Sequence, residues 1–249
     1  MDTKTLHIGC SSYNTASWLG IFYPEAIMKK QWFEYYSSHF KTYELNATFY
    51  RFPTLKSLQN WYDKTPEGFL FAVKAPKQIT HFNKFVEVQQ LVSDFYSVCK
   101  EGLQEKLGPV LFQLPPSFSY TPERLELIIS TLNPDFTNVV EFRNESWWLP
   151  EVYEALNKAT ITFCSVNYPK LPTTLIGTTD IGYIRLHGSP KLFYSAYTPS
   201  ELQELFQQIL NMQQWKTVYV YFNNTASTAG IENAVAFQKI EEDHKITPK

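Results

Sequence analysis

The segment NVVEFR, residues 138–143, is an apolar run that ends in two charged residues one position apart. Side chains alternate between the faces of a strand, so Glu141 and Arg143 share a face. Seven other apolar runs also end in polar clusters, at residues 9–13, 44–46, 73–76, 111–115, 165–167, 185–188 and 221–224. Polar groups at the same end of eight strands predict one shared polar pocket.

Helical patterns separate nearly all of these runs. Strands are expected at residues 6–11, 42–47, 69–74, 110–113, 138–142, 160–166, 183–187 and 218–222. Helices are expected at residues 23–39, 53–61, 86–102, 121–132, 150–158, 198–212 and 232–242. Strands that alternate with helices predict a parallel sheet, and eight such units predict an α/β fold of the (β/α)8, TIM-barrel-like class. We expect a single barrel domain over residues 1–249.

One unit of this pattern is weak. Residues 167–180 contain Pro169, Pro172 and Gly177 with little helical periodicity, so we expect a degenerate or missing helix there. An open doubly wound sheet is the alternative fold. No glycine-rich phosphate fingerprint follows the first strand, which favours the barrel.

Composition limits the classes of function. The formal net charge of −2 over 249 residues argues against a protein that wraps nucleic acid or binds an anionic membrane. No run approaches the roughly 20 apolar residues that cross a bilayer, and residues 1–7 do not resemble a signal peptide. The odd count of three cysteines without metal spacing indicates free thiols and a cytoplasmic location.

Six segments carry a resemblance to a known family. They are ELNATFYRFP (44–53), FLFAVKAPKQITH (69–81), LGPVLFQLPPSF (107–118), VVEFRNESWW (139–148), YIRLHG (183–188) and VYVYFNNT (218–225). With them the chain resembles the DUF72, or YecE-like, family over nearly its whole length. The resemblance implies a TIM-barrel-like fold in bacterial and archaeal cytoplasmic proteins and brings no biochemical activity with it. Asn144 and Asn167 depart from the His and Asp that relatives often carry, which weakens a metal mechanism at those positions.

Glu44 and Glu141 end the second and fifth expected strands, on roughly opposite walls of a barrel. Two carboxylates that flank a substrate can divide acid and base roles when their environments separate their pKa values. We therefore take both as candidate catalytic residues, with His187 as the titratable partner. Ion pairing with nearby cations, or a structural role for His187, is the alternative.

Lys74, Arg143 and Arg185 form a cationic group at the same strand ends. Three cations against two carboxylates leave a positive excess, which predicts a small anionic or polar substrate. Internal charge balance is the alternative interpretation. A Schiff-base role for Lys74 requires a desolvated amine, which the sequence does not show.

The other candidate ligand-binding residues are polar or aromatic groups near strand ends. They are Tyr13, Asn46, Gln113, Trp147, Tyr221, Asn223 and Asn224. Trp147 would form a flat wall, and the amides would orient hydroxyls or phosphate, unless packing and turn formation explain these residues. No cofactor and no metal cluster is predicted, although one divalent ion held by Glu141 and His187 is a weaker alternative.

The leading hypothesis is a cytoplasmic enzyme that acts on a small, polar, anion-bearing metabolite, with a sugar-like compound as one candidate. The first alternative is metal-dependent processing of phosphoesters or nucleic acid, which the near-zero charge and the few histidines disfavour. The second is a ligand-binding protein without catalysis. The sequence does not define an oligomeric state.

Overall fold

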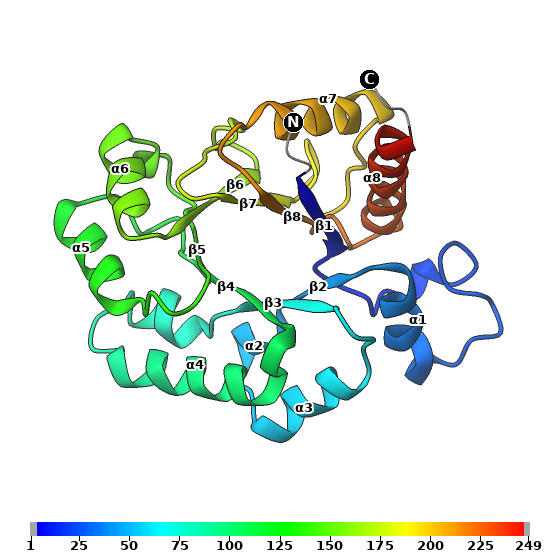
Figure 1. Cartoon of the computed structure of the whole chain (residues 1–249), viewed down its shortest axis with the longest axis horizontal. Coiled ribbons are helices and arrows are strands. Elements are labelled where there is room, and N and C mark those ends of the chain that lie inside the picture. The colour runs from blue at the N-terminus through cyan, green and yellow to red at the C-terminus, as the bar shows by residue number, and fades with distance from the viewer. Residues whose placement is uncertain (1–3, 247–249) are drawn as a thin grey trace.

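The structure, a computed structural model, describes residues 4–246. Eight parallel strands follow one another in the order β1-β8-β7-β6-β5-β4-β3-β2 and curl into a nearly closed barrel, with helices outside it (Figure 1). The strands are β1 (Thr5–Cys10), β2 (Thr42–Leu45), β3 (Leu70–Lys74), β4 (Leu107–Gln113), β5 (Asn138–Glu141), β6 (Thr162–Asn167), β7 (Ile181–Leu186) and β8 (Thr217–Phe222). The predicted TIM-barrel-like α/β fold, in a single domain, is confirmed.

Eight α-helices are present among residues 4–246. They are α1 (Trp32–His39), α2 (Ala47–Tyr50), α3 (Leu55–Asp63), α4 (Gln89–Leu103), α5 (Pro122–Thr131), α6 (Pro150–Lys158), α7 (Pro199–Asn211) and α8 (Ala229–Ile246). Thr54, Thr121 and Thr198 cap three of them by accepting a backbone N–H with the side chain. None of the helices within residues 4–246 has the length and apolar character needed to cross a membrane.

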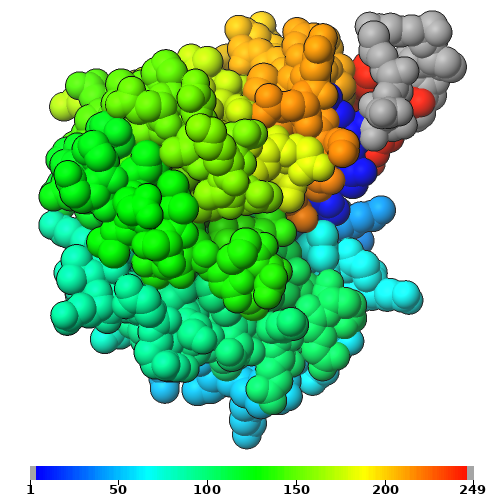
Figure 2. All heavy atoms as spheres, turned by 60° about the vertical axis from the view of Figure 1, so that its left-hand side comes forward, coloured from blue at the N-terminus to red at the C-terminus, as the bar shows by residue number. Residues whose placement is uncertain are grey.

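Alternation along the strands divides the core into two layers. Val110 and Phe112 of β4 face outward into a large apolar layer beneath the helices, whereas Leu111 faces the barrel interior. The interior cluster also contains Tyr183 and Tyr221 and is much smaller. On the face shown in Figure 2, the green segments from the middle of the chain pack into a continuous surface. The polar strand ends therefore lie above a packed interior, not above an open pore.

The barrel is closed at the β1–β2 seam by a side chain. The strand order leaves β1 and β2 at opposite ends of the hydrogen-bonded sheet. The Tyr36 hydroxyl accepts a hydrogen bond from the Cys10 backbone N–H at 2.7 Å and donates one to the Thr42 carbonyl at 3.0 Å. Gly9 allows this approach, because a Cβ there would lie 2.5 Å from the Thr42 carbonyl oxygen. The Tyr36 hydroxyl group thus takes the place of some of the backbone hydrogen bonds that would otherwise join β1 and β2.

Tyr36→Phe is expected to lower the free energy of unfolding by about 2 kcal/mol, because it leaves a buried backbone donor and acceptor unpaired. Urea unfolding of the variant measures the loss. Tyr35→Phe is the matched control, since within residues 4–246 the Tyr35 hydroxyl makes no hydrogen bond. Equal stability of the two variants would show that the phenol does not join the two strands.

The expected degenerate unit lies between β6 and β7, where residues 168–180 form an irregular loop without a helix. Threonine and serine side chains hold this loop against β6. Thr178 Oγ1 donates to the Ile161 carbonyl at 2.7 Å and accepts from the Phe163 N–H at 2.9 Å. Ser165 Oγ accepts from the Ile176 N–H at 2.9 Å. The outer face of β6 is thus covered by a loop where other strands have a helix.

Three helix starts differ from the predicted boundaries by three residues or more, and one of them, α8, begins at Ala229, before the predicted residue 232. Helix α4 begins at Gln89 and not at residue 86, because Lys84, Phe85 and Glu87 all have positive φ angles that a right-handed helix does not contain. Helix α1 begins at Trp32 and not at residue 23. The Tyr23 ring stacks on Trp32 with centroids 4.9 Å apart, which fixes residues 23–31 as an irregular connection.

Candidate functional site

The carboxyl ends of β2, β5 and β7 place three charged side chains in one buried cluster. Arg185 donates from Nε and Nη2 to the two oxygens of Glu44, at 2.8 and 2.7 Å. Its Nη1 donates to Glu141 Oε2 at 2.6 Å. The two carboxylates were predicted to flank a substrate, but the Arg185 guanidinium occupies the space between them. Arg185 is therefore neutralised internally and does not serve as a free anion anchor.

Glu44 has a complete set of hydrogen-bond donors. In addition to Arg185, it accepts from Ser11 Oγ at 2.6 Å, Asn46 Nδ2 at 2.9 Å and the Tyr183 hydroxyl at 2.8 Å. Burial alone would raise the pKa of Glu44, but the charge and hydrogen bonds of Arg185 outweigh it and lower that pKa. A fully buried, five-donor carboxylate is suited to fixing the barrel end and poorly suited to carrying a proton.

A second chain of contacts runs from Glu141 to the end of β8. Arg143 Nε donates to Glu141 Oε1, and Arg143 Nη2 donates to His187 Nε2 at 3.0 Å. The Asn223 carboxamide lies 2.7 Å from His187 Nδ1. A guanidinium only donates, so His187 Nε2 accepts from Arg143, and the Asn223 atom beside Nδ1 is the amide nitrogen Nδ2. Both ring nitrogens of His187 are therefore occupied.

The titration of this chain follows from its burial. Burial would raise the pKa of Glu141, yet the charges of Arg143 and Arg185 hold that pKa well below its usual value. Burial, aided by the charge of Arg143, lowers the pKa of His187 to about 3. Near neutral pH, Glu141 is ionised and His187 is uncharged. Neither group changes its charge in the range where a general acid or base would act.

Lys74, the last residue of β3, differs from the other charged groups at the site. Its Nζ donates to Gln113 Oε1 at 2.9 Å and lies 4.2 Å from the centroid of the Phe49 ring. Among residues 4–246, no carboxylate lies within ion-pair distance of this amine. Burial, together with the charge of Arg185, lowers the pKa of Lys74 to about 7. Lys74 is thus the group at this site that titrates near neutral pH.

Exposure increases from the interior of this cluster toward the barrel mouth. Glu44, Glu141 and His187 are inaccessible, whereas Lys74 is 9% exposed and the Arg143 side chain 8%. The two carboxylates balance the two arginines, so a protonated Lys74 supplies one positive charge in excess. The excess charge lies at the level where solvent, or a ligand, reaches the cluster.

Three predicted ligand-binding residues lie outside this cluster. Tyr13 packs its edge on Phe33, Tyr43 and Trp61 in the outer apolar layer. Trp147 is inaccessible, and its Nε1 donates to the Phe118 carbonyl at 2.7 Å. Asn224 Nδ2 donates to the Ser195 carbonyl at 2.9 Å and ties the end of β8 to the loop before α7. All three contribute to packing or loop attachment.

The remaining predicted residues lie in or just below the cluster. Asn46 and Gln113 contact Glu44 and Lys74, as described above. Tyr221 lies deeper, where its hydroxyl is 2.6 Å from Thr42 Oγ1. Among residues 4–246 the cis peptide bond is Ser189–Pro190, and the bonds before Pro115 and Pro116 are trans.

Four further residues at the site were not among the predicted ones, and one of them is Ser11, which donates to Glu44. Tyr183 hydrogen-bonds Glu44, and its position two residues before Arg185 in β7 was a usable signal of a shared face. Tyr168 places its ring 4.0 Å from the Arg143 guanidinium carbon. Phe49 lies against Lys74. The last two come from a loop and a short helix, where strand alternation gives no information.

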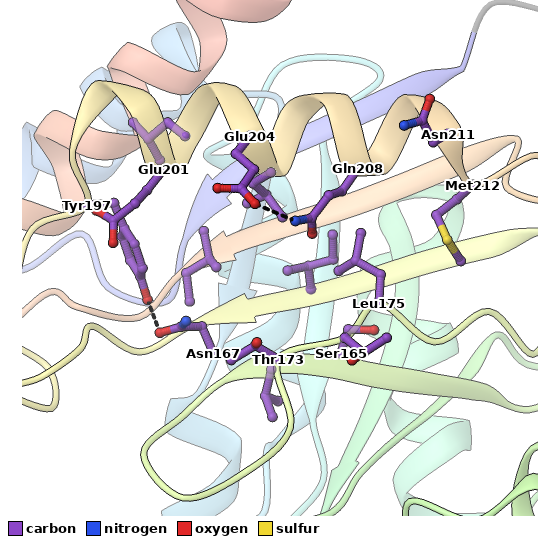
Figure 3. Close-up of a pocket in the computed structure, with 16 residues that line it drawn as sticks. Ser165, Asn167, Thr173, Leu175, Tyr197, Glu201, Glu204, Gln208, Asn211 and Met212 are labelled. Carbon is purple, nitrogen blue, oxygen red and sulfur yellow. Dashed lines mark hydrogen bonds between the residues drawn. The ribbon is translucent and has the colours of Figure 1, made fainter.

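A cavity of about 550 Å³ lies away from this cluster, on the outer wall of the barrel (Figure 3). Its floor is the outer face of β6 and β7, and α7 forms one side. It occupies the position left by the helix that is missing after β6. None of the predicted site residues lines it, and its mixed polar and apolar lining identifies no ligand. Within the described part of the chain, no group of three or more His, Cys, Asp or Glu side chains is arranged to hold a metal ion.

Comparison with known proteins gives a consistent set of relatives. The family model described as "Protein of unknown function DUF72" matches residues 7–248. The UPF0759 protein YunF of Bacillus subtilis is 28% identical over 244 residues, covering 85% of this chain and 86% of that protein. A crystal structure of a DUF72 family protein from Thermotoga maritima has a TM-score of 0.86 at 30% identity, covering 96% of this chain and 99% of that one. Another, from Enterococcus faecalis, has a TM-score of 0.82 at 21% identity, with 98% and 97% covered.

Proposed function

This chain belongs to the DUF72 family, and we propose that it binds a small anionic metabolite at the barrel mouth and acts on it as a cytoplasmic enzyme. The observation that carries the proposal is the charge balance of the strand ends. Glu44 and Glu141 are each paired with arginine, whereas Lys74 has no carboxylate partner among residues 4–246. A buried cation without a counter-ion favours an anion, because an anion supplies the missing charge.

Arg143 is the second anion-binding group in this proposal. Its Nε and Nη2 are engaged with Glu141 and His187, but its Nη1 makes no hydrogen bond within residues 4–246. Lys74 Nζ likewise uses only one of its N–H groups within residues 4–246, in the hydrogen bond to Gln113. These unused donors come from β3 and from the residues just after β5. They suit the oxygens of a carboxylate or phosphate.

Lys74 also takes the proton-transfer role in this proposal. The sequence suggested Glu44, Glu141 and His187 for acid–base chemistry. The structure surrounds the two carboxylates and the imidazole with partners and keeps their charges fixed near neutral pH. A lysine with a pKa of about 7 exchanges a proton readily in that range. Glu44, Glu141 and His187 then act by holding Arg143 and Arg185 in place.

Sulfate tests the anion site, because it stays a dianion over the relevant pH range. We expect calorimetry to detect sulfate binding at pH 6 that weakens by roughly tenfold or more at pH 8, as Lys74 loses its proton. Lys74→Gln should bind weakly at both pH values. Lys158→Gln, which alters an exposed lysine at the end of α6, should behave like wild type. Binding that is independent of pH and of Lys74 would contradict the proposed site.

A further inference from the structure

The Lys74 amine has the surroundings of a nucleophile. It is nearly buried, makes one hydrogen bond, to a neutral amide oxygen, and lies over an aromatic ring. Burial lowers its pKa to about 7. An amine of that kind is half neutral at pH 7, whereas an ordinary lysine is neutral in only about one molecule in 2,500. Neutral lysines in desolvated sites are the ones that attack carbonyl groups.

We propose that Lys74 forms a Schiff base with a small oxo acid whose carboxylate is held by Arg143. The inference rests on the proposed anion site and makes its ligand more specific. Arg143 follows β5 and Lys74 ends β3, so one strand lies between them. The free Nη1 of Arg143 would hold the carboxylate, and the adjacent carbonyl carbon would face Nζ. An oxo acid carries both groups, the carboxylate and the carbonyl group, on neighbouring carbons.

The reaction balances without an oxidant or reductant. The neutral Nζ attacks the carbonyl carbon, the carbonyl oxygen gains a proton, and a carbinolamine results. Loss of the hydroxyl group as water then leaves a carbon–nitrogen double bond to Lys74. The overall exchange converts one amine and one carbonyl group into one imine and one water molecule.

His81 contacts the same aromatic ring, Phe49, as the Lys74 amine. The His81 ring packs edge-on against the Phe49 ring with centroids 4.9 Å apart, and the Phe49 ring also contacts Lys74. Burial and the charge of Lys74 lower the pKa of His81 to about 4. The imidazole is therefore neutral at pH 7 and adds no positive charge beside the Lys74 amine. Its Nδ1 lies 2.9 Å from Thr80 Oγ1, which fixes the ring orientation.

Reductive trapping tests this inference. The protein is incubated at pH 7 with pyruvate or glyoxylate and sodium cyanoborohydride, and peptide mass spectrometry locates the adduct. We expect Lys74 to be labelled at least about tenfold faster than exposed lysines such as Lys158, given its larger neutral fraction. Lys74→Met should lose this fast phase, and Lys158→Gln should retain it.

A second variant tests the carboxylate anchor. Arg143→Gln should slow labelling by pyruvate roughly tenfold more than it slows labelling by propanal, which has no carboxylate, because the charge of Arg143 also affects the neutral fraction of Lys74 for both carbonyl compounds. Labelling spread evenly over surface lysines, or unaltered in Lys74→Met, would overturn the inference. If sulfate still binds through Lys74 in that case, the anion site stands and only the Schiff base is refuted. If sulfate does not bind either, both proposals fail.

Discussion

Arg185→Leu is expected to lower the free energy of unfolding by about 3–5 kcal/mol. The guanidinium is 1% exposed and donates to both Glu44 and Glu141, which are themselves inaccessible. Removing it leaves two carboxylates in the barrel with too few donors, and Glu44 loses its only cationic partner among residues 4–246. The cost is that of an uncompensated buried charge and not the net strength of an ion pair.

Urea unfolding at pH 7 measures this effect, and a double variant separates its causes. Adding Glu44→Gln to Arg185→Leu should recover part of the stability, because it removes the charge that the first change leaves unpaired. Arg51→Leu, at an exposed arginine after α2, should change stability by no more than about 0.5 kcal/mol. An Arg185→Leu loss as small as that of the control would show that the cluster is solvated.

The sequence was sufficient to predict the fold and the convergence of the strand ends. Strand alternation placed Glu141 with Arg143 and Arg185 with His187, and the structure joins all four in one chain of contacts. Strand alternation did not predict that the Arg185 side chain reaches across the barrel to Glu44. That contact depends on barrel diameter and side-chain conformation, which no local pattern encodes.

Several predicted site residues lie away from the charged cluster where the chain leaves the strands. Tyr13 and Trp147 follow strand ends, but the turns that carry them direct both rings to the outer layer. Asn224 is adjacent to Asn223, and alternation places the two on opposite faces. The start of α4 was missed because positive φ at non-glycine residues has no signature in composition. Loop direction is set by tertiary packing, which a single sequence does not reveal.

The predicted roles of the charged residues depended on which side chains each of them faces, and the sequence does not contain that information. Lys74 and Arg185 are both cations at strand ends. Arg185 faces two carboxylates, whereas Lys74 faces an amide oxygen. That difference separates a structural cation from a titrating one. It follows from the three-dimensional distribution of the acidic groups over β2 and β5.

Stability is expected to fall as the pH drops from 6.5, and His187→Gln should remove part of that dependence. The folded protein keeps His187 neutral down to a pKa of about 3, whereas the unfolded chain protonates this residue near its ordinary pKa of 6.5. Between these values the unfolded state binds one more proton. The contribution of His187 is therefore complete above pH 6.5 and declines by about 1.4 kcal/mol per pH unit below it.

The experiment compares slopes and not absolute stabilities, because His187→Gln also disturbs the contacts to Arg143 and Asn223. Urea unfolding from pH 6.5 to 4.5 avoids the lower range, where protonation of Glu141 adds a second loss. Over this interval wild type should lose about 2.5 kcal/mol more than the variant. His39→Gln, at an exposed histidine that ends α1, should retain the wild-type slope. Parallel curves for wild type and His187→Gln would show that the imidazole takes up its proton equally in the folded and unfolded states. That result would contradict the burial of the ring beside Arg143.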